Sequence, residues 1–101
     1  MPWIDYREVR RRIPMWRVLE LLGWEPHTRR GDQLRGSCPI QSGDSRPLFA
    51  VHLGKQVYYC HECQSGGDQL KLWQVIHQRP LYPATLDLCR AAHMEPPWLP
   101  S

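Results

Sequence analysis

Three cysteines constrain the fold of this chain more than any other feature. Cys38 precedes a hairpin-like segment, and Cys60 and Cys63 follow that segment with two residues between them. A Cys-x-x-Cys pair on a tight turn offers two thiolates to one metal ion, and zinc takes four ligands in a tetrahedron. The spacing therefore predicts a zinc site at the end of a β-hairpin, which would stabilise a chain of only 101 residues.

The ligand set lacks one obvious member. Gln41 stands three residues after Cys38, where a Cys or His would complete a second ligand pair. An amide oxygen is a poor zinc ligand beside three thiolates. Several alternatives stay open for the fourth position: Gln41 itself or a water, Asp44 in the same loop, His27 or His52 from nearby elements, His61 inside the second pair, or an empty site.

Other interpretations of the cysteines are less favoured. A redox pair is disfavoured because Cys60 follows a hairpin strand, and no strand-then-helix pattern surrounds it. Three buried thiols without a metal remain an alternative, and Cys89 is expected in the core face of a helix. The N-terminus lacks the apolar segment of a signal peptide, which predicts a cytoplasmic location. In that compartment, cysteines bind metals more often than they form disulfides.

The hydrophobic pattern predicts an α+β domain. Helices are expected over 6–12, 15–22, 69–78 and 83–92, with Asp5 and Asp68 as caps and Gly23 as a stop. Alternating residues predict a three-stranded antiparallel sheet from 33–35, 48–53 and 56–59. We expect a single domain over 1–101, with its core in residues 4–93 and a loose tail over 94–101. No stretch is apolar enough for a membrane span.

These motifs together resemble the zinc-binding domain of bacterial DnaG-type primases, over about residues 4–93. The matching residues are Arg35, Gly36, Cys38, Pro39, Pro47, Phe49, Val51, Lys55, Gln56, Tyr58, Cys60, Cys63, Gly67 and Asp68. The resemblance implies a zinc ribbon with flanking helices, which contacts single-stranded template DNA beside a separate catalytic domain. Two departures fall on the first ligand pair. Gln41 replaces the family's histidine, and the following loop is one residue longer.

Two functions follow as expectations. The first is a zinc module that binds single-stranded DNA through cations and stacking aromatics on the outer sheet face. Its candidate residues are Arg35, Arg46, His52, Lys55 and Tyr59. The second is a protein-interaction adaptor, favoured by a net charge of only +3 and by Trp3, Trp16, Trp24 and Trp98.

The acidic residues are scattered along the chain, so no catalytic metal cluster is expected. We therefore expect no enzyme activity from the chain alone. A protein partner would supply catalysis in a larger replication or mobile-element assembly. The sequence leaves the oligomeric state open.

Overall fold

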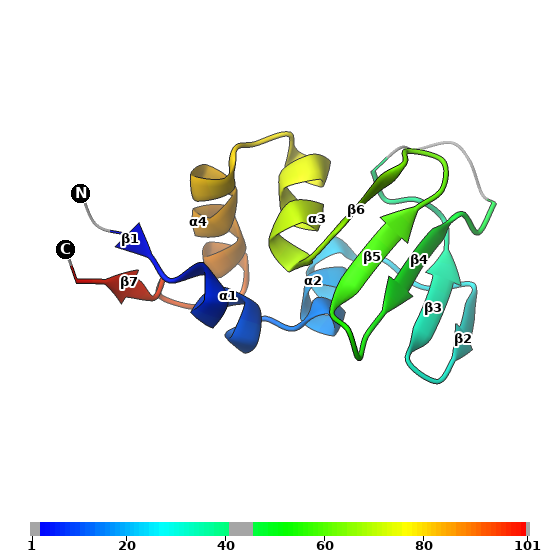
Figure 1. The fold of residues 1–101 in the computed structure, drawn as a ribbon, viewed down its shortest axis with the longest axis horizontal. Coiled ribbons are helices and arrows are strands. Elements are labelled where there is room, and N and C mark those ends of the chain that lie inside the picture. Colours follow the sequence, from blue (N-terminus) through cyan, green and yellow to red (C-terminus); the bar gives the residue numbers. More distant parts are fainter. Residues whose placement is uncertain (1–2, 41–45, 101) are drawn as a thin grey trace.

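The computed structural model describes residues 3–40 and 46–100. The molecule is elongated, with extents of 45 × 27 × 21 Å. Helices α1, α3 and α4 and a short two-stranded ribbon lie at one end, and a five-stranded sheet lies at the other (Figure 1). In the described ranges, no helix is both long and apolar enough to cross a membrane.

The N-terminal helices begin and end where the sequence predicts. Helix α1 spans Tyr6–Arg12, and the Asp5 side chain accepts a hydrogen bond of 3.1 Å from the Glu8 amide. Such a cap satisfies an amide that has no partner within the helix. Helix α2 spans Met15–Leu22 and ends at Gly23, whose φ of 70° suits a residue without a Cβ.

The C-terminal helices pack on each other. Helix α3 spans Gln69–His77, and the Asp68 side chain accepts a 3.0 Å hydrogen bond from the Lys71 amide. Helix α4 spans Leu81–Ala91, so it begins two residues before the predicted start at Pro83. Pro83 occupies the first turn, where backbone amides have no helical acceptor, so a missing N–H costs nothing there.

The sheet is larger than predicted. All five strands are antiparallel, in the order β2-β3-β4-β5-β6, and the expected three strands form its centre. Their bounds are Thr28–Arg30 (β2), Gln33–Gly36 (β3), Phe49–His52 (β4), Val57–Cys60 (β5) and Ser65–Gly67 (β6). The prediction of three strands was wrong because β2 and β6 have three residues each and show no apolar alternation.

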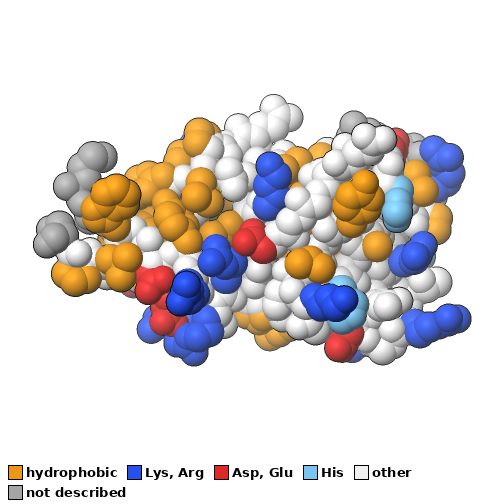
Figure 2. Space-filling model, viewed as in Figure 1, with side chains coloured by type: hydrophobic (Ala, Val, Ile, Leu, Met, Phe, Trp, Pro, Cys, Tyr) orange, Lys and Arg blue, Asp and Glu red, His pale blue; other side chains and the backbone are white. Residues whose placement is uncertain are grey.

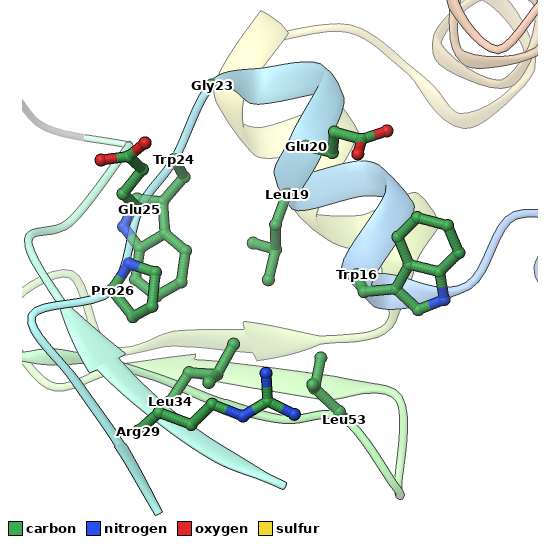
Figure 3. Close-up of a pocket in the computed structure, with 10 residues that line it drawn as sticks. All are labelled: Trp16, Leu19, Glu20, Gly23, Trp24, Glu25, Pro26, Arg29, Leu34 and Leu53. Carbon is green, nitrogen blue, oxygen red and sulfur yellow. The ribbon is translucent and has the colours of Figure 1, made fainter.

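The two sheet faces differ in character. The inner face carries buried side chains: Leu34, Phe49, Val51, Tyr58 and Cys60. Helix α2 lies against this face (Figure 3). The alternate residues of the same strands point outward, as the period-two pattern of a half-buried sheet requires.

The predicted loose tail over 94–101 is also corrected. Within it, strand β7 (Trp98–Leu99) pairs with β1 (Trp3–Ile4) at the other end of the chain. The Asp5 amide donates a 2.8 Å hydrogen bond to the Pro97 carbonyl, which extends this contact. The prolines before Trp98 favour extended backbone, which suits a strand that lies at an edge.

Candidate metal centre and outer sheet surface

The three predicted cysteines converge at one end of the sheet. Cys38 lies two residues beyond β3, Cys60 ends β5, and Cys63 lies in the turn that leads to β6. Their sulfur atoms all lie within 4.8 Å of one another, and the Cys38 and Cys63 sulfurs are 3.5 Å apart. None of the chain's cysteines forms a disulfide.

This geometry fits zinc. With zinc–sulfur bonds of about 2.3 Å, two sulfurs of a tetrahedral site stand about 3.8 Å apart. The observed separation of 3.5 Å is close to that value, so only a small adjustment is needed to receive the ion. Thiolates are soft ligands that zinc prefers over oxygen donors.

Local backbone structure holds the Cys60–Cys63 pair in place. The pairing of Cys60 with Ser65 closes a hairpin around both cysteines, and Gln64 takes a positive φ of 53° in the turn of this hairpin. The Cys63 amide donates to the Cys60 sulfur at 3.4 Å. The His61 amide donates to the Leu48 carbonyl at 2.9 Å, which ties the turn to the segment before β4.

The thiols influence one another's protonation. Burial, together with the nearby sulfurs of Cys38 and Cys60, raises the pKa of the Cys63 thiol to about 12. Burial also acts to raise the pKa of Cys60, but hydrogen bonds from the Cys63 amide and the neighbouring thiols outweigh it and lower that pKa. Without a cation the cluster therefore favours one thiolate. A bound zinc ion would compensate the negative charge of several thiolates, so its binding would release protons from the thiols.

Three histidines that the sequence offered as fourth ligands do not place a ring nitrogen in the thiol cluster. His27 Nε2 is 3.1 Å from the Ser37 hydroxyl, and His52 Nδ1 accepts a hydrogen bond from the Lys55 amide. The His61 ring packs edge-on against Tyr59, with centroids 4.9 Å apart. Over residues 3–40 and 46–100, the three cysteines alone form a metal-sized cluster.

The remaining metal candidates and Cys89 have different outcomes. Gln41 and Asp44 lie outside the described residues. Cys89 is fully buried in α4 and lies outside the thiol cluster, so its expected place in the core is confirmed. Burial raises the pKa of its thiol.

The outer sheet face brings three predicted nucleic-acid residues together. Arg35, Ala50 and Tyr59 are neighbours across β3, β4 and β5, and His52 lies beside Val57 in the adjacent row. Arg35, His52 and Tyr59 line one shallow hollow of about 240 Å³.

Tyr59 has the exposure that stacking requires. Its side chain is 44% exposed, and its ring lies over Gly66, where a Cβ would meet Tyr59 Cδ2 at 2.8 Å. Lys55 lies in the β4–β5 turn, and Arg46 lies three residues before β4, so neither is among the residues that line the hollow. The structure therefore brings Arg35, His52 and Tyr59 together, and it places Lys55 and Arg46 beyond the two ends of β4.

Sequence reasoning missed the contribution of β2. Thr28 pairs with Arg35, and Arg30 pairs with Gln33, so all four side chains emerge on the outer face. They line a second hollow of about 390 Å³ at the sheet edge. The sequence feature that could have indicated β2 is the turn at Gly31, because such a turn predicts a hairpin with a strand on each side of it.

The fold and its thiol cluster define a zinc ribbon, and comparisons with known proteins identify the family. Residues 8–99 match the model of the CHC2 zinc finger, the DnaG zinc ribbon. The chain belongs to this family. Because the family binds zinc and three cysteines cluster here, zinc is the cofactor.

Individual relatives agree with this assignment. The chain is 32% identical over 85 residues to a DNA primase of Synechocystis, and 33% identical over 79 residues to one of Treponema pallidum. These stretches cover 83% and 77% of this chain, but 13% of either relative. The solved structure of the zinc-binding and RNA polymerase domains of Aquifex aeolicus primase superposes with a TM-score of 0.73 at 27% identity, covering 92% of this chain and 22% of that one.

Proposed function

We propose that this chain is a primase-like zinc module that binds single-stranded DNA within a larger replication or mobile-element assembly. One observation carries the proposal: exposed Tyr59 and Arg35 flank the small residue Ala50 on one open sheet face. A base stacked on a tyrosine contributes about 1–3 kcal/mol, and arginine contacts phosphates in bidentate fashion. The face therefore offers both components of single-strand recognition.

The proposed zinc ligands are Cys38, Cys60 and Cys63, with Gln41 as the candidate for the fourth position. Zinc would hold the ends of β3 and β5 together and so fix the outer face. Zinc held by these four ligands would supply structure rather than reaction chemistry, because such a site leaves no coordination position open to a substrate.

We further propose that the chain is not an enzyme by itself. It spans 13% of the Synechocystis primase, which is too little to include most of that protein. A separate catalytic protein would supply primer synthesis or a related reaction. The cytoplasmic location expected from the sequence remains a prediction.

Binding of labelled single-stranded DNA tests the leading function. About three or four phosphate contacts should give a log–log salt slope of about −2 to −3. We expect Arg35→Ala and Tyr59→Ala each to weaken binding, whereas Arg90→Ala removes the same charge as Arg35→Ala on an exposed position of α4 and should not. Absence of binding at low salt would refute the function, and normal binding by both sheet variants would refute the proposed face.

Metal content tests the ligand set. We expect about one zinc per chain in the wild type, and tighter retention against a chelator in Gln41→His, because imidazole is a better zinc ligand than an amide. Equal retention by both proteins would show that position 41 is not a ligand. A wild type without zinc that regains it in Gln41→His would indicate a decayed site.

A second candidate function, docking onto a protein partner, is favoured by exposed aromatic side chains. Trp3, Trp16 and Trp98 are 66%, 54% and 41% exposed. Trp24 is instead structural, because its indole N–H donates to the Ser37 carbonyl and its ring packs edge-on against Phe49. Apolar side chains gather at the end of the molecule that carries the β1–β7 ribbon (Figure 2).

A groove between α2 and the sheet adds to this docking candidate. It has a volume of about 360 Å³, and Leu19, Leu34 and Leu53 point into it beside Trp24 (Figure 3). An adaptor without nucleic-acid affinity would show no salt-dependent DNA binding. Its association with a catalytic partner would then weaken on Trp3→Ala or Trp16→Ala.

A further inference from the structure

Helix α1 and the β4–β5 turn form a basic hollow beside the sheet. Arg7, Arg10 and Arg11 from α1 line it together with Lys55 from the turn, and its volume is about 350 Å³. Lysine and arginine side chains lie over α1 and over the sheet on the same side of the molecule (Figure 2). The hollow is therefore accessible from the side that carries the outer sheet face.

The hollow carries excess positive charge. Arg7 and Lys55 are exposed and make no ion pair with any described residue. Arg10 lies 3.7 Å from Asp68, and both side chains are more than one-third exposed, so this pair is weak. Glu8 pairs with both Arg11 and Arg12, so one carboxylate is shared between two cations. An anionic ligand would therefore meet cations that the protein leaves uncompensated.

A buried hydrogen-bond network fixes α1 relative to the sheet. The Gln69 side chain is 2% exposed and donates to the carbonyls of Arg10 and Ile13, both at 3.1 Å. It also lies 3.3 Å from Gln56 Oε1, which accepts from the Met15 amide. Gln56 belongs to the β4–β5 turn, so this network connects the turn to the end of α1. The backbone of the helix that carries the arginines is thus held beside the turn that carries Lys55.

The hollow is continuous with the proposed DNA-binding face. Val57 lines both this hollow and the one formed by Arg35, His52 and Tyr59. We infer that the hollow is a second binding site, for the phosphodiester backbone of the same single-stranded DNA, which runs from Tyr59 across Val57 to α1. This inference rests on the proposed function. It adds a path for the DNA over the protein surface and a longer binding footprint.

The lining residues indicate phosphate contacts rather than base recognition. Among the described residues, no aromatic side chain lines the hollow, so it lacks the aromatic face that Tyr59 offers to a base on the sheet. Arginine forks bind phosphate oxygens in bidentate fashion, and such contacts do not depend on base sequence. The site would therefore add affinity for longer strands without adding sequence preference.

Two oligonucleotides of different length test the inference on the full chain loaded with zinc. A thymidine oligonucleotide of about four residues should occupy the sheet face alone, and one of about twelve should reach α1, in line with single-strand site sizes of about 4–16 nucleotides. Arg7→Ala should weaken binding of the longer one by about three- to tenfold. It should also reduce the log–log salt slope by about 0.7, the value for one phosphate on a single strand. Binding of the shorter one should not change.

Two further variants separate the outcomes. Tyr59→Ala should weaken binding of both lengths, and Arg90→Ala should affect neither. If Arg7→Ala behaves like Arg90→Ala while the wild type binds both lengths, the second site is refuted and the proposed function stands. If Arg7→Ala weakens both lengths equally, the separate footprint is refuted. If the wild type binds neither length, both proposals fail.

Discussion

Replacement of Gln69 by leucine tests the network that joins the helices to the sheet. Pro14 has no backbone N–H, so the Arg10 carbonyl lacks the donor four residues ahead that a continuous helix would provide. Gln69 supplies that donor through its side chain and also satisfies the Ile13 carbonyl. Leucine has a similar volume and good helix propensity, so Gln69→Leu removes the hydrogen bonds with little change in packing.

The expected loss of stability is large for a domain of this size. A buried polar group left without its partner costs about 1–3 kcal/mol, and this substitution leaves two carbonyls and the Gln56 amide oxygen with fewer donors. Some burial of leucine surface offsets part of that cost. We therefore expect about 2–4 kcal/mol of destabilisation, against a typical total stability of about 5–15 kcal/mol.

Denaturant and thermal unfolding followed by circular dichroism would measure the effect. The matched control is Gln74→Leu, on the same helix, where the glutamine side chain makes no hydrogen bond with any described residue. A loss of about 2 kcal/mol corresponds to a fall in Tm of about 8–16 °C for a chain of this length. A difference between the two variants below about 0.5 kcal/mol would show that the network contributes no net stability.

Three further predictions concern local contacts. After chelation of zinc, a thiol reagent should label Cys38, Cys60 and Cys63 sooner than Cys89, because removal of the ion loosens the end of the sheet that carries the thiol cluster, whereas Cys89 stays packed in the helical core. Mass spectrometry would locate the labels, and equally rapid labelling of all four cysteines would contradict this core. Gly36→Ala should cost about 1–3 kcal/mol of unfolding free energy, because its Cβ would meet Trp24 Cζ2 at 2.8 Å; unchanged stability would show that Trp24 moves freely. Asp5→Ala should cost about 1 kcal/mol through loss of the α1 cap, whereas retention of full stability would show that the cap is redundant.

Local signals predicted the helices well. Asp5, Gly23 and Asp68 act within a few residues of their own positions, so sequence alone locates the helix ends that they determine. The hairpin between Cys38 and Cys60 was predicted for the same reason, since its alternation and its turn are local.

Some of the missed features depend on distant partners, and others are too short to show a pattern. Strand β7 exists only because it pairs with β1 at the opposite end of the chain, and β2 and β6 are too short to show a pattern of their own. The sequence could not predict the role of Gln69 either, because the carbonyls that accept its hydrogen bonds lie 56 and 59 residues away along the chain. On a helix, an isolated glutamine gives no sign that it is buried.

Strand β5 makes the metal centre and the proposed DNA-binding face interdependent. Its consecutive residues Tyr59 and Cys60 point to opposite faces, so Tyr59 is exposed outward while Cys60 is fully buried beside the other thiols. Zinc would hold this end of β5 to the segment after β3, and β3 carries Arg35. The separation between the Tyr59 ring and the Arg35 guanidinium would then depend on the zinc ion, although zinc contacts neither side chain. Loss of zinc should therefore weaken DNA binding even though none of the proposed DNA contacts involves a metal ligand.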